Sequence, residues 1–140
     1  MNIKFYKCSK CGQVVAKVVD SNVPITCCGE EMLELVPRFI EREGNEKHVP
    51  KLSIYKKKII VKVGETLHPF TETHYISWIM VVSNKGVQVK EIKRGEEPIA
   101  TFNLMKGEKV LEVFSYCNLH GLWKTDNPDC LIGGCPFFRK

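Results

Sequence analysis

The chain has 140 residues with a formal net charge of +5, and 44% of them are hydrophobic and 26% charged. These proportions are ordinary for a small globular protein, and no apolar run is long enough for a membrane span or a signal peptide. Basic residues are interleaved with acidic ones, which does not favour a nucleic-acid-binding surface. We therefore expect a cytoplasmic protein that has no membrane or nucleic-acid partner.

The N-terminal segment, residues 1–36, contains two pairs of cysteines. Cys8 and Cys11 form a Cys-x-x-Cys pair, and Cys27 and Cys28 follow after fifteen intervening residues. In a reducing compartment such cysteines are more often metal ligands than disulfide halves. A hairpin at residues 13–19 is expected to bring the second pair to the first, which completes a four-thiolate site. Because Cys27 and Cys28 are adjacent, we expect a distorted tetrahedron. Spacing does not choose between iron and a zinc ion that only stabilises a small core.

From about residue 44 onward the pattern is that of short β-strands. Runs rich in β-branched and aromatic residues, separated by turn residues, predict strands at 58–63, 74–82, 87–92, 99–104 and 110–116. No amphipathic helix is predicted. Strands at this spacing are typical of an antiparallel β-sandwich of immunoglobulin type. We expect its core to include Trp78, Ile79, Phe102 and Phe114.

The four histidines of the chain and a further cysteine lie beside or between these strands. His68 and His74 bracket a short segment, Cys117 and His120 are three residues apart, and His48 precedes Val49-Pro50. Any one of them alone is more often an ordinary core or surface residue. Their joint arrangement favours a shared metal at one end of the sandwich. Four imidazoles and a thiolate exceed the four ligands that zinc normally takes, and they suit a redox metal such as iron.

In their order and content these motifs resemble the desulfoferrodoxin family, the two-iron superoxide reductases. The resemblance covers residues 5 to about 126, and its matching segments are Cys8-x-x-Cys11 with Cys27-Cys28, Glu46-Lys47-His48-Val49-Pro50, His68-Pro69 with His74, and Tyr116 to Lys124. It implies a desulforedoxin-like Fe(Cys)4 knot on the four N-terminal cysteines. It also implies a second iron in the sandwich, with the four histidines as equatorial ligands and Cys117 as the axial ligand.

The resemblance further implies the reaction and the partners. In that family the ferrous second centre gives one electron to superoxide, and with two protons the product leaves as hydrogen peroxide, without release of dioxygen. Glu46 would bind the ferric iron, while Lys47 would attract the anion and help to deliver protons. Without the neighbouring His48, the two would be read as a solvated ion pair. Members of the family are typically homodimers and are reduced again by rubredoxin or a similar carrier.

The change from the cysteine-containing segment to the strand pattern divides the chain near Pro37. We expect a metal knot at 1–36, a linker at 37–43, the sandwich at 44–126 and a C-terminal extension at 127–140. The extension departs from the family, whose members usually end after Trp123-Lys124. Cys130 and Cys135 therefore inherit no role, and we expect a disulfide or free thiols there in preference to a third metal site.

Two other classes of function stay open from the sequence. One is an electron-transfer protein in which both metals only relay electrons, and the other is a zinc-stabilised binding module without turnover. An open coordination position and the Glu46-Lys47 pair favour the enzyme.

Overall fold

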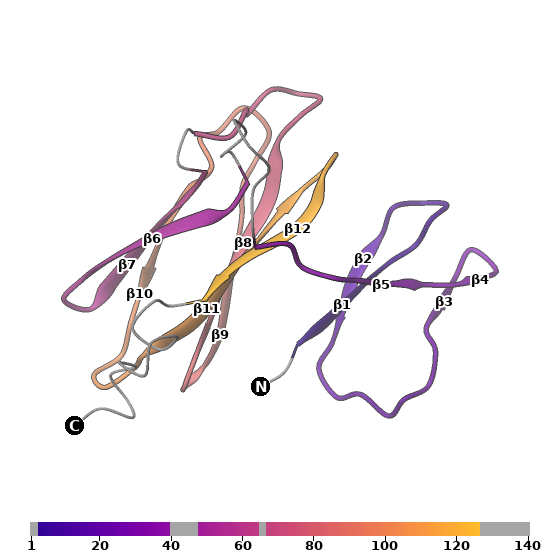
Figure 1. Ribbon diagram of the computed structural model, residues 1–140, viewed down its shortest axis with the longest axis horizontal. Helices are drawn as coiled ribbons and strands as arrows, with labels where there is room; N and C mark the ends of the chain where they lie inside the picture. Colours follow the sequence, from indigo (N-terminus) through magenta and orange to yellow (C-terminus); the bar gives the residue numbers. More distant parts are fainter. Residues whose placement is uncertain (1–2, 40–47, 65–66, 127–140) are drawn as a thin grey trace. The chain divides into compact units, whose positions relative to one another are not determined.

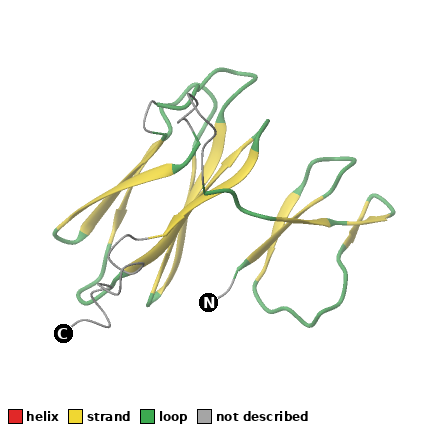
Figure 2. Cartoon of the chain, viewed as in Figure 1, coloured by secondary structure: helices red, strands yellow, loops and turns green. Residues whose placement is uncertain are grey.

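The computed structural model describes residues 3–39, 48–64 and 67–126. These residues form strands, turns and loops without any helix (Figure 1 and Figure 2), so the predicted all-β class is confirmed. No helix in the described part is long and apolar enough to cross a membrane. Contacts between residues divide the chain into two compact units, Met1–Val36 and Pro37–Lys140.

The first unit consists of two small antiparallel sheets. The three-stranded sheet has β1 at its centre, and the other sheet is a two-stranded hairpin. The strands are β1 (Lys4–Lys7), β2 (Val14–Lys17), β3 (Thr26–Cys27), β4 (Glu30–Glu31) and β5 (Leu33–Leu35). Within residues 3–36 only Phe5, Cys8 and Met32 are buried. A unit with so small a core usually needs a metal or disulfides to be stable.

The second unit is a β-sandwich of two antiparallel sheets, as predicted. One sheet has the strand order β10-β7-β6 and the other has the order β12-β11-β8-β9. The strands are β6 (Pro50–Tyr55), β7 (Lys58–Val63), β8 (Ile76–Ser83), β9 (Gly86–Glu91), β10 (Ile99–Asn103), β11 (Val110–Cys117) and β12 (Gly121–Asp126). Five of them agree with the predicted runs to within two residues, whereas β6 and β12 were not predicted as strands.

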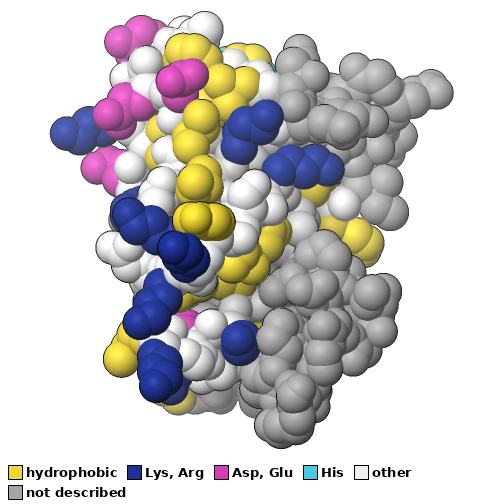
Figure 3. All heavy atoms as spheres, turned by 90° about the vertical axis from the view of Figure 1, so that its left-hand side faces the viewer, with side chains coloured by type: hydrophobic (Ala, Val, Ile, Leu, Met, Phe, Trp, Pro, Cys, Tyr) yellow, Lys and Arg dark blue, Asp and Glu magenta, His cyan; other side chains and the backbone are white. Residues whose placement is uncertain are grey.

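The alternation of side chains along β7 explains why the two sheets pack together. Ile59, Val61 and Val63 are fully buried between the sheets, while Lys58 and Lys62 are exposed on the other face. Figure 3 shows the side of the molecule on which β6 and β7 lie, where Lys and Arg side chains flank a strip of hydrophobic ones. The outer face of this sheet is therefore basic and partly apolar.

The residues predicted to form the core behave almost as expected. Ile79 and Phe102 are fully buried and Phe114 is 4% exposed. Trp78 is half-buried and stacks on Tyr116, with 5.9 Å between the ring centroids. A closely packed interior of this kind holds the ends of the strands in fixed positions. The site described below depends on those strand ends.

Candidate metal centres

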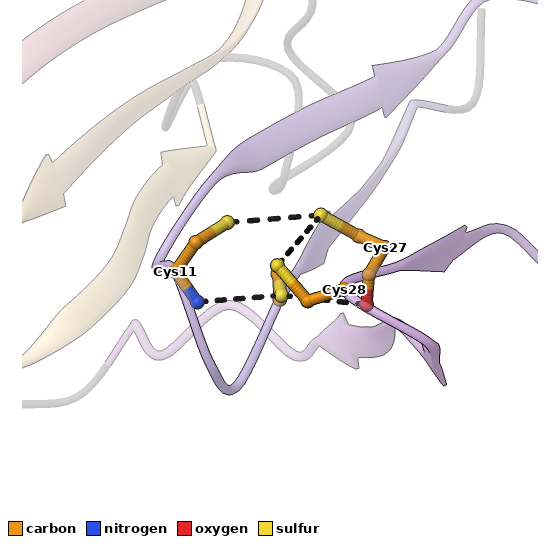
Figure 4. A group of neighbouring side chains, drawn as sticks. Cys11, Cys27 and Cys28 are labelled. Atoms are coloured by element: carbon orange, nitrogen blue, oxygen red, sulfur yellow. Dashed lines mark hydrogen bonds between the residues drawn. The ribbon is translucent and has the colours of Figure 1, made fainter.

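The four cysteines of the first unit converge on one point. The Sγ atoms of Cys8, Cys11, Cys27 and Cys28 all lie within 4.8 Å of one another. Cys27 Sγ is 3.6 Å from Cys11 Sγ and 4.0 Å from Cys28 Sγ (Figure 4). Four sulfurs placed tetrahedrally at about 2.3 Å from a metal are about 3.8 Å apart. The spacing therefore fits a tetrahedral metal site, and none of these cysteines forms a disulfide.

Two tight turns carry these cysteines. At the first, the Cys11 amide donates a hydrogen bond to Cys8 Sγ over 3.4 Å. At the second, Cys28 (φ 53°) and Gly29 (φ 77°) both have left-handed backbone, which costs about 1 kcal/mol at a residue other than glycine. This turn of the β3–β4 hairpin lets adjacent cysteines face one centre. The prediction that a hairpin at residues 13–19 carries the second pair was wrong, because β2 instead pairs with β1.

The pKa values of these thiols are shifted by contacts among the four cysteines. The backbone amide of Cys11 lowers the pKa of Cys8 to about 6. Hydrogen bonding to neighbouring sulfurs, above all that of Cys8, raises the pKa of Cys27 to about 12. Hydrogen bonding, above all with Cys11, likewise raises the pKa of Cys28. Several thiolates this close repel one another, so a metal ion is what allows all four to ionise together.

The second cluster lies at one end of the sandwich, where strands begin or end. His48 stands two residues before β6, and His74 stands two residues before β8. Cys117 is the last residue of β11, and His120 directly precedes β12. His68 follows β7, and its amide donates a hydrogen bond to the Val63 carbonyl over 3.0 Å. Five separate points of the sequence thus meet because the strands are paired antiparallel.

The distances between donor atoms are those of a metal site. The Nδ1 atom of His120 lies 3.0 Å from Nε2 of His48 and 3.6 Å from Sγ of Cys117. The donor atoms of these three residues and of His74 all lie within 4.8 Å of one another. Two nitrogens that bind one ion at about 2.1 Å and at a right angle are about 3.0 Å apart. The cluster is therefore a candidate site for one metal ion.

Each of the four imidazole rings lies against two others. Neighbouring ring centroids are 4.8 Å apart for His48 and His68, 4.6 Å for His68 and His74, 5.0 Å for His74 and His120, and 4.8 Å for His120 and His48. The diagonal pair His48 and His74 is 6.4 Å apart. A tetrahedral set would have six similar separations. The four short sides and the longer His48–His74 separation therefore indicate a closed four-membered ring of imidazoles and not a compact tetrahedral set.

His68 gives an independent reason to place a metal among these rings. Its Nδ1 lies 2.7 Å from the Pro69 carbonyl oxygen, so Nδ1 carries the hydrogen and donates it. Its Nε2 is buried and has no hydrogen-bond partner among the described residues. Burial lowers the pKa of His68 to about 4, so the ring is neutral at pH 7. A neutral, buried nitrogen without a partner costs about 1 to 3 kcal/mol, which coordination would offset.

Cys117 is fully buried, and its sulfur accepts backbone hydrogen bonds. The His120 amide donates to Cys117 Sγ over 3.4 Å. Burial raises the pKa of the Cys117 thiol, while the amides of His120 and Leu119 act in the opposite direction. Amide donors withdraw electron density from a ligating thiolate. The sequence motif gave no indication of these hydrogen bonds.

Polar side chains hold the ligand-bearing segments against each other. Asn118 accepts a hydrogen bond from the Tyr75 amide at Oδ1 over 2.9 Å and donates one from Nδ2 to the Thr73 carbonyl over 2.9 Å. It thereby forms hydrogen bonds with the residues on both sides of His74 in the sequence. On the other side, Ser115 Oγ donates to the carbonyl of His48 over 3.2 Å. These contacts fix the histidines relative to β11.

Two residues beside this cluster, Trp123 and Arg38, were not predicted from the sequence to take part in the site. Trp123 stacks on His48 with 4.6 Å between the ring centroids. The guanidinium carbon of Arg38 lies over the Trp123 ring, 5.6 Å from its centroid. Trp123 belongs to the last family-like motif, and this was the one indication of a role. Four residues singled out in the sequence lie outside the described residues: Glu46, Lys47, Cys130 and Cys135.

A β-sandwich with a histidine and cysteine cluster at one end, preceded by a four-cysteine knot, defines a protein with two metal sites. The Desulfoferrodoxin family model matches residues 40–126. A desulfoferrodoxin homolog of Archaeoglobus fulgidus is 40% identical over 123 residues, which cover 88% of this chain and 96% of that protein. A desulfoferrodoxin of Syntrophotalea carbinolica is 37% identical over 124 residues, which cover 89% and 96%. The chain therefore belongs to the desulfoferrodoxin family, as its motifs predicted.

A solved structure agrees with this assignment. The crystal structure of the superoxide reductase from Treponema pallidum matches with a TM-score of 0.78 and 28% sequence identity. The match covers 89% of this chain and 98% of that one.

Proposed function

We propose that this protein is a superoxide reductase, which reduces superoxide to hydrogen peroxide with one electron and two protons and releases no dioxygen. The observation that carries the proposal is the ring of four neighbouring imidazoles with the Cys117 sulfur beside it. Membership of the desulfoferrodoxin family and the likeness to the Treponema pallidum superoxide reductase support it.

The ligands that we propose for the second centre are His48, His68, His74, His120 and Cys117. A set of four imidazoles and one thiolate would suit a redox-active iron better than a structural zinc, which normally takes four ligands. An iron held there would supply the electron that superoxide accepts. The amides that donate to Cys117 moderate the electron donation of its thiolate.

The burial of the histidines indicates the side from which a small anion enters. His48 is 3% exposed and His68 is fully buried. By contrast, His120 is exposed and His74 is half-buried. We assign the approach of superoxide to the edge formed by His74 and His120, because solvent reaches the cluster there.

The two residues before His48 complete the proposal. Lys47 attracts superoxide and helps to deliver protons, because an ammonium group near the mouth of the site raises the local concentration of an anion. Glu46 is the carboxylate that binds the oxidised centre. Both roles rest on their sequence position beside a proposed ligand and on the family resemblance.

For the remainder of the chain we propose an Fe(Cys)4 centre in a knot at 1–36, a linker at 37–43, the catalytic sandwich at 44–126 and an extension at 127–140. Zinc is the alternative metal for the cysteine site, since its geometry suits both ions. The first centre stores or relays an electron that a rubredoxin-like carrier supplies. We further propose a homodimer in the cytoplasm.

The stoichiometry of the products tests this function. Xanthine oxidase or a radiolysis pulse supplies superoxide, and peroxide and dioxygen are measured with the reduced protein and an electron donor. A reductase forms one peroxide for each superoxide consumed. One peroxide for every two superoxides, with dioxygen released, would identify a dismutase instead. No consumption of superoxide would leave only the electron-relay or binding-module functions.

A further inference from the structure

Arg38 and His48 both contact the ring of Trp123, next to the second centre. The guanidinium carbon of Arg38 lies 5.6 Å from the centroid of the Trp123 ring. The Trp123 ring lies 4.6 Å from the imidazole of His48, and the two planes are only 17° apart. The Trp123 ring therefore contacts both a cation and an imidazole of the histidine cluster.

The backbone holds Arg38 in this position. Its amide donates to the Leu122 carbonyl over 3.0 Å, and its carbonyl accepts a hydrogen bond from the Lys124 amide over 2.8 Å. These two bonds lie on either side of Trp123 and form an isolated parallel bridge with it. The guanidinium is thus anchored over the indole, which is only 5% exposed. Cation and ring contacts of this kind are favourable when the ring is desolvated.

Within the described part of the chain, no carboxylate forms an ion pair with Arg38. Neighbouring Lys124 forms ion pairs with Glu112 and Asp126, both at 3.1 Å, so its charge is neutralised locally. Arg38 forms no ion pair with residues 3–39, 48–64 or 67–126. Of these two cations beside Trp123, Lys124 is thus paired with carboxylates of the described residues and Arg38 is not.

We propose that Arg38 raises the reduction potential of the second centre through the Trp123–His48 stack. This inference rests on the proposed function, because it requires His48 to be a ligand of a redox-active metal. A nearby positive charge disfavours the oxidised metal, which carries one more positive charge than the reduced metal. The buried indole that Arg38 and His48 both contact takes the place of water there, which weakens the screening. Arg38 touches neither substrate nor metal and acts through two other rings.

Because both separations are measured to the Trp123 ring, the guanidinium carbon lies at most about 10 Å from the centroid of the His48 ring. For an effective dielectric between about 80 and 20, this separation corresponds to a change in the ratio of reduced to oxidised centre of about two- to fifteen-fold. Because Arg38 is exposed on one side, we expect a value of about fivefold, near the middle of that range.

The test is a potentiometric titration of the visible band of the second centre in the iron-loaded, full-length chain. Arg38→Gln should lower the reduced-to-oxidised ratio at a fixed potential about fivefold, and Arg38→Lys should retain most of the wild-type ratio. Lys56→Gln is the matched control, because Lys56 lies over the Tyr55 ring at 5.4 Å. It removes an equal charge beyond the other end of β6, a strand whose two ends are about 17 Å apart. This control should leave the ratio unchanged.

A double-mutant cycle with Trp123→Leu tests the path. If the field acts through the stack, Arg38→Gln should have a smaller effect when the indole is absent. Equal shifts in Arg38→Gln and Lys56→Gln would overturn the inference in favour of diffuse surface charge, and no shift in Arg38→Gln would overturn it outright. If Arg38→Gln loses its iron, Arg38→Met takes its place, because its apolar stem still covers the indole.

The same titration separates this inference from the proposed function. A wild-type chain whose second centre shows no one-electron transition would contradict the proposed ligand set and this inference together. A wild-type transition with an unchanged Arg38→Gln would contradict the role of Arg38 alone.

Discussion

Asn118 offers the sharpest test of how the fold positions a proposed ligand. Replacement by Ala removes two side-chain hydrogen bonds, one to the Tyr75 amide and one to the Thr73 carbonyl. At about 1 kcal/mol for each, the free energy of unfolding should fall by about 2 kcal/mol. Because both bonds flank His74, the affinity of the second centre for metal should fall further, by about 10- to 100-fold.

Asn84 provides a matched control for this substitution. Its side chain also makes two hydrogen bonds, to the Gly107 carbonyl over 3.4 Å and from the Lys109 amide over 2.7 Å. It lies beyond the far end of β8, about 26 Å along the strand from the metal cluster. Urea unfolding measures the stability of both variants, and chelator competition measures their metal affinity. Asn84→Ala should lose similar stability and keep its metal affinity. Equal metal affinities in the two variants would refute the positioning role of Asn118.

Three further predictions follow from the two centres and their surroundings. Cys11→Ser should lose the first metal yet keep most superoxide reduction in a single turnover, because we place substrate at the second centre; loss of that activity with the second metal intact would contradict this. Lys47→Ala should lower the second-order rate constant for superoxide about tenfold and flatten its fall with ionic strength, as pulse radiolysis across a salt series can measure, whereas Glu46→Ala should leave that constant nearly unchanged. In the metal-free protein the depressed pKa of His68, about 4, contributes stability that is present above its unfolded pKa of about 6.5 and is lost as the pH falls toward 4. Urea unfolding at pH 7 and pH 5 should show this loss, and His68→Gln should reduce it.

The cysteine knot could be predicted from sequence because its donors lie in a short segment with few ways to fold. The Cys-x-x-Cys turn fixes one pair, and the second pair is close enough in sequence to reach it. How Cys27 and Cys28 share a site was not predictable, because it depends on a left-handed backbone at Cys28. That conformation is unusual for cysteine, and no local pattern indicates it.

The residue pattern predicted the histidine cluster as a set, whereas an arrangement of its ligands was implied only by the family resemblance. Each ligand flanks a strand, so antiparallel pairing was enough to bring them to one end of the sandwich. β12 was missed because Gly121 and Asp126 at its ends read as turn residues, and its pairing with β11 is what makes it a strand. The contact of Arg38 with Trp123 joins residues far apart in the chain. Neither periodicity nor a motif predicts such a contact.

X-ray absorption at the iron edge of the Cys11→Ser variant is the most direct test of the central claim, that four imidazoles and the Cys117 thiolate hold one iron. The variant removes the iron signal of the first centre, so only the second centre contributes. We predict about four nitrogen donors near 2.1 Å and one sulfur donor at about 2.3 Å. The sulfur should disappear from the spectrum when Cys117→Ser is added. A spectrum without a sulfur donor, or one dominated by several sulfurs, would contradict the account.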